Sequence, residues 1–263
     1  MKDMHEKRRR PAQTAPVEEI EGQLEGRNAL TEALKSGRTI DKVFIAAGDT
    51  DRALQRLAAQ AKEAGAVVVP VDRRKLDAMS TTHSHQGVIT LAAAHEYSTI
   101  DDILQEAADR GENALIVICD ELTDPHNLGA ILRSAECAGA HGVIIPKRRS
   151  VGLTAVVAKA SAGAVEYMKV ARVTNINNAI AELKEKGVWI FGTAAEGSIP
   201  MYQADLTGPA AIVIGNEGQG MRPLVRKNCD VTVNIPMKGR ISSLNASAAA
   251  SILLYEAGRQ RLG

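Results

Sequence analysis

An arginine stands inside an otherwise small and apolar helical pattern near the middle of the chain. Arg133 lies in the segment TDPHNLGAILRS, which directly follows the apolar run Ala114–Asp120. An arginine in such a helix either extends its charged end to water or serves a polar site, and Glu136 is close enough to pair with it. Asn127 can cap a helix expected over Leu128–Ala140. The segment therefore predicts polar chemistry, or a local ion pair, at the end of a strand.

A second segment, IGNEGQGM, is rich in glycine and follows the apolar run Ala210–Gly215. Three glycines in six residues allow tight turning or a close approach of the backbone to a ligand. Their spacing, GxxGxG, differs from the dinucleotide fingerprint GxGxxG, and no long capped helix follows at once. A conventional dinucleotide site is therefore disfavoured, and the turn predicts contact with some other ligand.

The third segment, IPMKGRISSLNASAAA, leads through Ser243 and Asn245 into a helix expected over Leu244–Gln260. Ser243 can cap that helix, and the small residues after it let another element pack closely. All three segments follow strands of one expected parallel sheet, and ligands bind beyond the carboxyl ends of such strands. We therefore expect their polar side chains to meet at that edge.

The elements that must position these segments alternate between apolar runs and helical periodicity. Several runs are continuously apolar, which is typical of a parallel sheet buried on both faces. An α/β fold is expected, divided into a disordered basic tail (1–16), a small α/β domain (17–94), a linker (95–111) and a second α/β domain (112–263). Strands are expected at Lys42–Ala46, Ala66–Val71, Gly87–Ala92, Ala114–Asp120, Gly142–Pro146, Val165–Val170, Val188–Thr193, Ala210–Gly215 and Val231–Ile235.

Composition excludes some classes of protein and leaves the partner open. The apolar runs are too short to span a bilayer, and the three cysteines form no CxxC pair, so a reducing cytoplasm is expected without disulfide or zinc ribbon. His83 and His85 have no further ligand at metal spacing, which makes a metal site improbable. The formal net charge of +1 neither favours nor excludes nucleic acid, because basic runs such as Lys147–Arg149 can form a local patch or a plain solvated surface.

The three segments together resemble the signature motifs of the SpoU/TrmH branch of the SPOUT RNA methyltransferases, in order and at the expected separations. The resemblance covers the chain from about Ile20. Its first part, with GRNAL, KVFIA and HQGVI, resembles the ribosomal-protein-like RNA-binding domain of the RlmB-type 23S rRNA guanosine 2′-O-methyltransferases. The resemblance implies an α/β-knot catalytic domain, S-adenosylmethionine as cofactor, transfer of its methyl group to a ribose 2′-oxygen, 23S rRNA as partner, and a homodimer that completes the active site across its interface.

The resemblance also implies roles for individual residues. Arg133 takes the central catalytic role, either as a base or, more easily for a group that is normally always protonated, by orienting a phosphate and the hydroxyl. The other catalytic positions are Asn127, Glu217, Ser243 and Asn245. The cofactor positions are Thr193, Gly215, Asn216, Ile235, Met237 and Leu244. Lys147, Arg148 and Arg149 are expected to bind RNA.

Two alternatives remain at this point. One is a tRNA 2′-O-methyltransferase, which the small domain argues against because the resemblance implies that tRNA-type relatives usually lack it. The other is a non-catalytic RNA-binding relative, against which the complete set of polar positions argues. The modified nucleotide and the role of the tail, with its run Lys7–Arg10, stay open.

Overall fold

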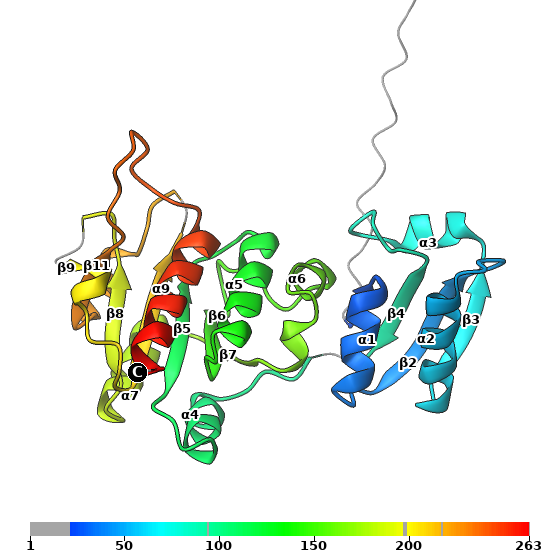
Figure 1. The fold of residues 1–263 in the computed structure, drawn as a ribbon, viewed down its shortest axis with the longest axis horizontal. Coiled ribbons are helices and arrows are strands. Elements are labelled where there is room, and N and C mark those ends of the chain that lie inside the picture. Colours follow the sequence, from blue (N-terminus) through cyan, green and yellow to red (C-terminus); the bar gives the residue numbers. More distant parts are fainter. Residues whose placement is uncertain (1–21, 94, 197–198, 217, 263) are drawn as a thin grey trace, which may run out of the picture.

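The computed structural model describes residues 22–93, 95–196, 199–216 and 218–262. They form two domains that lie side by side along the longest axis of the molecule (Figure 1). The expected tail lies outside the described residues. No helix within the described ranges is long and apolar enough to cross a membrane.

The small domain is built on a four-stranded sheet of strand order β1-β4-β2-β3. Strands β2 and β3 are parallel, and the pairs β1–β4 and β2–β4 are antiparallel. Its elements are β1 (Gln23–Glu25), α1 (Arg27–Lys35), β2 (Ile40–Ala46), α2 (Arg52–Glu63), β3 (Val67–Val71), α3 (Arg73–Met79) and β4 (Val88–Ala92). The strand expected at Ala66–Val71 is present as β3, but the expectation that it is buried is wrong, because β3 lies at the edge of the sheet and Val67 is 57% exposed.

The second domain has a seven-stranded sheet of order β7-β6-β5-β10-β8-β11-β9, and its strands pair in parallel. This confirms the expected parallel α/β architecture. Its elements are α4 (Ile100–Asp109), β5 (Leu115–Asp120), α5 (Pro125–Cys137), β6 (Gly142–Pro146), α6 (Ala155–Ala160), η1 (Ala164–Glu166), β7 (Lys169–Val173), α7 (Ile176–Glu185), β8 (Trp189–Thr193), β9 (Ile199–Pro200), η2 (Met201–Gln203), β10 (Ala210–Gly215), α8 (Pro223–Asn228), β11 (Val231–Asn234) and α9 (Ala246–Arg261).

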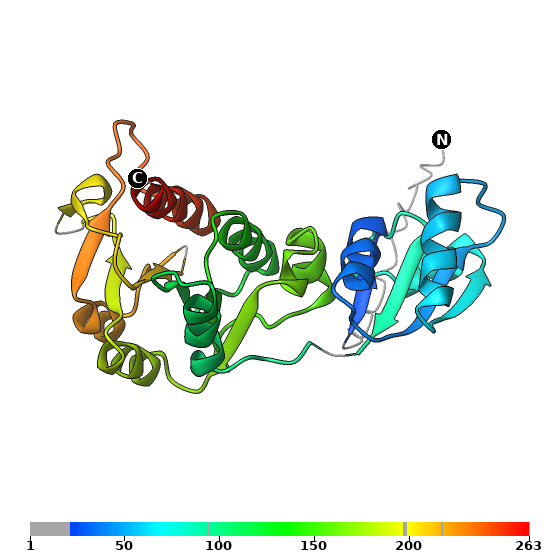
Figure 2. The ribbon, with the colours of Figure 1, turned by 60° about the horizontal axis from the view of Figure 1, so that its bottom comes forward.

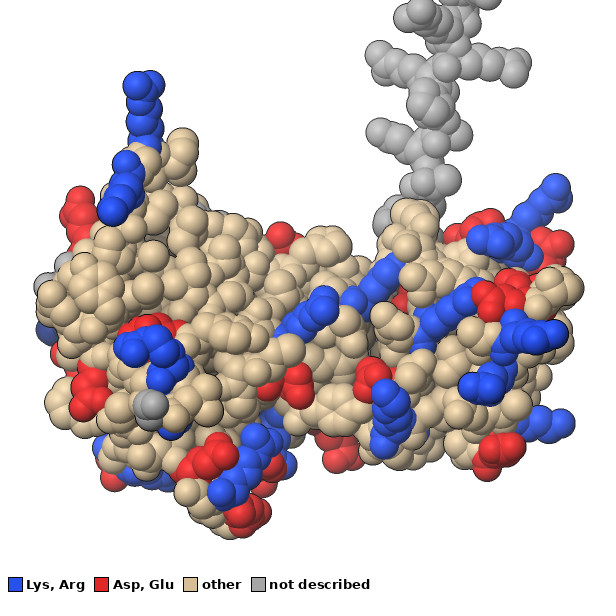
Figure 3. Space-filling view, in the orientation of Figure 1, with Lys and Arg blue, Asp and Glu red and all other residues tan. Residues whose placement is uncertain are grey.

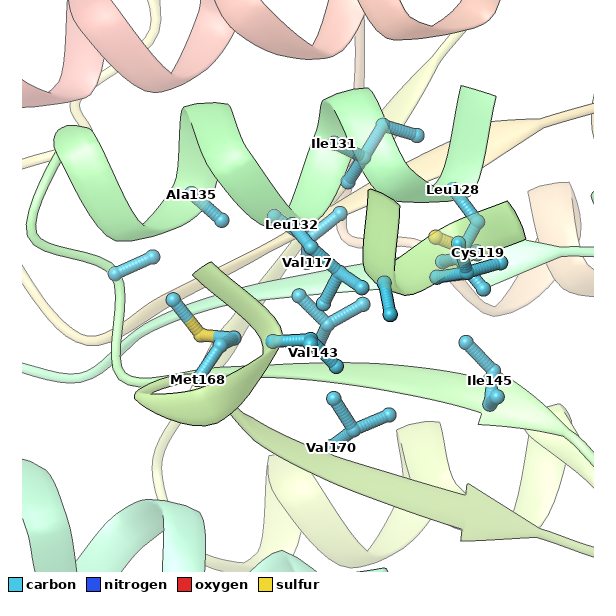
Figure 4. Close-up of a cluster of buried hydrophobic side chains, with 14 of the residues drawn as sticks. Val117, Cys119, Leu128, Ile131, Leu132, Ala135, Val143, Ile145, Met168 and Val170 are labelled. Carbon is cyan, nitrogen blue, oxygen red and sulfur yellow. The ribbon is translucent and has the colours of Figure 1, made fainter. Parts of the chain in front are cut away.

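Helices cover both faces of this sheet (Figure 2). Successive strand residues point to opposite faces, so Val117 packs under α5 while its neighbours Ile116 and Ile118 pack on the side of α4 and α7. Figure 4 shows the first of these layers, in which α5 lies over β5, β6 and β7. A continuous apolar strand is thus explained by a separate core on each face.

The segment expected to be a linker, 95–111, contains α4 and packs into the second core. Ile103 is fully buried against Gly142, where an added Cβ would lie 2.5 Å from its side chain. The expected strand at Val165–Val170 is also wrong. Gly163 has a φ of 93° and starts the 3-10 turn η1, so the extended strand β7 begins only at Lys169.

The chain returns across the sheet after β11. Helix α9 packs against α5 and β10 rather than beside β11. The Arg261 guanidinium donates to the carbonyl oxygens of Leu206, Asn113, Ala114 and Gly208, at 2.6–3.2 Å. The last helix is therefore fixed to the loop that precedes β10 and to the start of β5.

Charged and polar groups join the two domains along a boundary that we call the domain seam. Glu166 of the second domain is 3% exposed in its side chain and pairs with Arg38 at 2.8 Å and His95 at 3.3 Å. The Tyr167 hydroxyl donates to Glu32 at 2.6 Å, and Lys159 donates to the Ser84 carbonyl at 2.5 Å. The seam thus holds the small domain against η1 and α6 through directed polar contacts, and buried apolar residues of both domains belong to one hydrophobic cluster.

Candidate active site

A cavity of about 540 Å³ opens at the carboxyl ends of β8, β10 and β11. Its volume lies within the roughly 300–1,000 Å³ that is usual for small-molecule sites. All six positions expected to bind a cofactor line it, namely Thr193, Gly215, Asn216, Ile235, Met237 and Leu244. The glycine-rich turn and the segment before α9, more than twenty residues apart, therefore form one wall.

The glycine-rich turn closes tightly on itself. The backbone N–H of Asn216 donates to the Gly220 carbonyl at 3.1 Å, and the backbone N–H of Gly220 donates to the Asn216 carbonyl at 2.8 Å. A Cβ on Gly215 would lie 2.3 Å from the backbone of Gly220 and Met221, which cannot give way as a flexible side chain could. A glycine is needed at position 215 because the turn folds back over it.

The rest of the wall combines backbone with apolar and small side chains. The Thr193 hydroxyl donates to the Val213 carbonyl at 2.8 Å, so it fixes the ends of β8 and β10 to one another. Ala249 and Leu253 enter from α9, while Glu196 and Arg226 supply charge at the wall. The motif reasoning missed these four residues: small and apolar side chains in a helix look like ordinary core, and isolated charges like ordinary surface.

Asn127 and Asn245 connect the first and third motif segments. The Asn245 side-chain amide donates to Asn127 Oδ1 at 2.9 Å, and its own Oδ1 caps α9 by accepting from the amides of Ser247 and Ala248. Both capping expectations were therefore wrong. Helix α5 begins at Pro125 with Asp124 as its cap, which places Asn127 inside the helix, and Asn245 takes the capping role expected of Ser243.

Ser243 lines the cavity, whereas Arg133 does not. Arg133 is exposed on α5, and no ion pair with Glu136 or Asp120 is found among the described residues. Asp120 instead accepts from Arg222. One chain thus assembles the Asn127–Asn245 pair and Ser243 near the cavity but leaves Arg133 on its surface; Glu217 lies outside the described residues.

The three basic residues after β6 are exposed, and they divide between two surroundings. Arg149 lines a second hollow beside the main cavity, between the ends of β5 and the glycine-rich turn, while Lys147 and Arg148 line neither. Figure 3 shows further basic side chains over the visible face of the small domain and at the tip of the loop between β11 and α9. Across the described part of the chain, no cluster of three or more His, Cys, Asp or Glu has the arrangement of a metal site.

Two family models match the two domains. Residues 114–255 match the SpoU rRNA Methylase family, and residues 23–98 match the family described as RNA 2'-O ribose methyltransferase substrate binding. YacO of Bacillus subtilis, which is named as a TrmH family tRNA/rRNA methyltransferase, is 47% identical over 236 residues that cover 90% of this chain and 94% of YacO.

Two solved structures with bound AdoMet (S-adenosylmethionine) are similar over most of both chains. The SpoU methyltransferase AviRb of Streptomyces viridochromogenes has a TM-score of 0.79 at 26% identity, covering 91% of this chain and 90% of its own. An rRNA methyltransferase of Sinorhizobium meliloti has a TM-score of 0.77 at 27% identity, covering 92% and 88%. The expected fold and cofactor are therefore confirmed.

The cavity itself fits S-adenosylmethionine. Ile235 and Leu244 offer an apolar wall for an adenine ring, and the backbone of the glycine-rich turn offers hydrogen-bonding groups without side chains in the way. The cofactor would supply an activated methyl group when bound; Ser243 lines the cavity, and Asn245, between the lining residues Leu244 and Ala246, donates to Asn127. With both domains matched and the cofactor accommodated, the chain belongs to the SpoU/TrmH family of RNA 2′-O-ribose methyltransferases.

Proposed function

We propose that this protein methylates the 2′-hydroxyl of a guanosine in 23S rRNA, as a cytoplasmic homodimer. The observation that carries the choice of rRNA is the small substrate-binding domain fixed to the catalytic domain by the buried Glu166 contacts. A tRNA is the other candidate substrate, and the relatives' names leave room for it. In a large folded RNA such as 23S rRNA, the small domain can bind a folded region that lies next to the ribose held by the catalytic domain.

The reaction requires the hydroxyl proton to be removed while the oxygen is held in line with the methyl group. We assign the orientation of the hydroxyl and its neighbouring phosphate to Arg133, whose planar guanidinium can bind both at once. Ser243 and Asn245 position the ribose at the cavity mouth, and Asn127 holds Asn245 at 2.9 Å. Glu217 is proposed to act with them.

A dimer is proposed because Arg133 is exposed and lies outside its own chain's cavity. A two-fold axis near α5 would bring the Arg133 of one protomer to the cavity of the other. Mixing an Arg133→Ala protein with a second variant that cannot bind the cofactor tests this. Random exchange should restore about a quarter of wild-type sites, because half of the dimers would be mixed and each would hold one complete site. No recovery despite demonstrated subunit exchange would contradict the shared site.

The substrate is tested by mapping 2′-O-methylation in a strain that lacks the protein. Loss of one ribose methyl group from 23S rRNA, restored by the purified protein with S-adenosylmethionine on the unmodified transcript, is the expected result. Loss from a tRNA, with 23S rRNA unchanged, would instead support the tRNA alternative. The Arg133→Ala variant serves as the matched inactive control in both measurements.

A further inference from the structure

The second hollow, of about 260 Å³, opens directly beside the cofactor cavity. Its walls come from the end of β5, from the segment after β6 and from the glycine-rich turn. Four of its residues also line the cofactor cavity, namely Asn216, Gln219, Gly220 and Met221. A group bound in the hollow would therefore lie next to the place where the methyl group is transferred.

Three charged side chains line the hollow, namely Glu121, Arg149 and Arg222, and the buried Asp120 pairs with the last of them. Asp120 is fully buried and accepts from the Arg222 backbone amide and Nε at 2.8 Å each, and pairs with Nη2 at 2.7 Å. Glu121 Oε1 then faces Nη1 of Arg222 at 3.2 Å and Nη1 of Arg149 at 3.4 Å. Two carboxylates thus balance two guanidinium groups, and the wall offers both donors and acceptors.

The backbone of this wall is strained. Glu121 and Arg149 both have a φ of 58°, in the left-handed region that side chains of this size rarely adopt. Such conformations persist only where the surroundings impose them, and they gather at functional sites. Here they bring Glu121 and Arg149 together at the lining of the hollow, and the Asn216 side chain holds Glu121 by donating to its carbonyl at 3.1 Å.

We propose that this hollow binds the base of the nucleotide whose ribose is methylated, and that Glu121 selects guanine. The inference rests on the proposed function. A volume below the roughly 300 Å³ at which small-molecule pockets begin suits a single base. A phosphate is a poor occupant, because Asp120 and Glu121 already balance the two arginines.

The donors and acceptors of the wall match guanine. Its Watson–Crick edge presents two adjacent donors, N1–H and the N2 amino group, which an ionised carboxylate can accept; its O6 and N7 are acceptors that a guanidinium can bind. Adenine and cytosine would turn a ring-nitrogen acceptor toward the carboxylate, and uracil would offer a single donor, N3–H, between two carbonyl oxygens. Glu121 Oε2 makes no hydrogen bond within the described part of the chain, which leaves it available for the second donor.

The test compares guanosine with inosine at the methylated position of a 23S rRNA transcript. Inosine keeps the shape and pairing face of guanosine but lacks the N2 amino group. The wild-type protein should methylate the inosine transcript about tenfold more slowly, the scale of losing one hydrogen bond to a charged group. Glu121→Gln should methylate guanosine at least tenfold more slowly and lose most of the preference over inosine, with unchanged affinity for S-adenosylmethionine.

Glu185→Gln, an exposed carboxylate on α7, is the matched control and should behave as the wild type does. A wild-type protein that does not distinguish the two transcripts would overturn the inference without any variant. So would a Glu121→Gln protein that is slower on both transcripts by the same factor, since that is the behaviour of a purely structural carboxylate. Absence of methylation anywhere in 23S rRNA would overturn the proposed function, and this inference with it.

Discussion

The cofactor cavity and the domain seam are held in place by different kinds of interaction. The cavity depends on backbone closure and apolar packing, as at Gly215, where no room exists for one additional carbon atom. The seam adds directed polar contacts to its apolar packing, with Glu166 between Arg38 and His95. Cofactor binding in the cavity should therefore change with the volume of its side chains and little with pH. The stability that comes from the polar contacts beside the seam should change with pH and little with side-chain volume.

A buried polar cluster in the small domain extends this contrast. Glu25 is 1% exposed and accepts from Ser80, Thr81 and Thr82, and Lys159 of the catalytic domain donates to the Thr82 hydroxyl at 3.0 Å. The layer beneath α5 is built from apolar side chains such as Val117, Ile131 and Val143. The cluster thus links a buried carboxylate of the small domain, through Thr82, to Lys159 of the catalytic domain.

The largest expected effect is on the rate of methyl transfer when Arg133 is replaced; this residue belongs neither to the cofactor cavity nor to the domain seam. Arg133→Ala should slow methyl transfer by about a hundredfold to ten-thousandfold, the scale of a positioned catalytic group, and Arg133→Lys nearly as much, because lysine lacks the planar fork. Unfolding free energy should change by less than about 1 kcal/mol, because the side chain is exposed. Single-turnover methylation and thermal unfolding of the same proteins separate the two quantities. Near-normal rates in both variants would remove Arg133 from the mechanism.

The second prediction concerns the pH dependence of the Glu25 cluster. Burial alone would raise the pKa of Glu25, but hydrogen bonds from Ser80, Thr82 and Thr81 lower it from 4.5 to about 2. A lowered folded-state pKa stabilises the protein above pH 4.5, and this contribution is lost as pH falls from 4.5 toward 2. The loss should be about 2 kcal/mol at pH 3 and approach about 3 kcal/mol only near pH 2. Urea unfolding of the wild type and of Glu25→Gln between pH 7 and pH 3 measures it, and equal slopes in both would contradict the assignment.

The third prediction tests the volume sensitivity of the cavity. Gly215→Ala should weaken S-adenosylmethionine binding by about tenfold or more, because the added methyl group forces the turn open at a cost of about 1–3 kcal/mol. Gly218→Ala is the matched control in the same turn, where the nearest atom to an added Cβ is 3.6 Å away. Calorimetric titration with the cofactor compares them. Equal affinities of Gly215→Ala and Gly218→Ala for S-adenosylmethionine would show that the turn can move to make room for the added methyl group.

The smallest effect is expected for the basic residues after β6. Replacing Lys147, Arg148 and Arg149 with alanine should weaken RNA binding and reduce the slope of log affinity against log salt by up to about 0.7–0.9 per lost phosphate contact. Arg149 should contribute least to the slope, because it already faces Glu121. Arg110→Ala, an exposed arginine paired with Glu106, is the control. If affinity and slope both remain at wild-type values, the three residues form only a solvated surface.

The sequence predicted the strands and their order along the chain more successfully than the local contacts. Apolar runs are local signals, so β5, β6 and β10 were identifiable from them, whereas the six cofactor positions came from the family resemblance; all six line the cavity. The pairing of Asp120 with Arg222, 102 residues apart, depends on tertiary packing and has no local signal. Neither has the left-handed backbone of Glu121, since glycine is the usual residue there.

The capping errors have a related cause. Asn127 and Ser243 are good capping residues by type, yet Asp124 and Asn245 were also available within three residues of each. Which of the neighbouring residues caps each helix follows from the contact between α5 and α9, in which Asn245 donates to Asn127. Tertiary contacts therefore decide where these helices begin, and residue preference alone cannot.

The domain seam has a consequence for how a target is chosen. With Glu166, Tyr167 and Lys159 all bound to the small domain, the distance between the two domains is set by side-chain contacts rather than by a loose tether. When the small domain binds an RNA, only riboses at one fixed distance from the bound part of the RNA would then reach the cavity. The seam contacts would thus set the distance at which the target ribose is selected. Removing some of these contacts should increase the number of methylated positions before it lowers the rate of methylation.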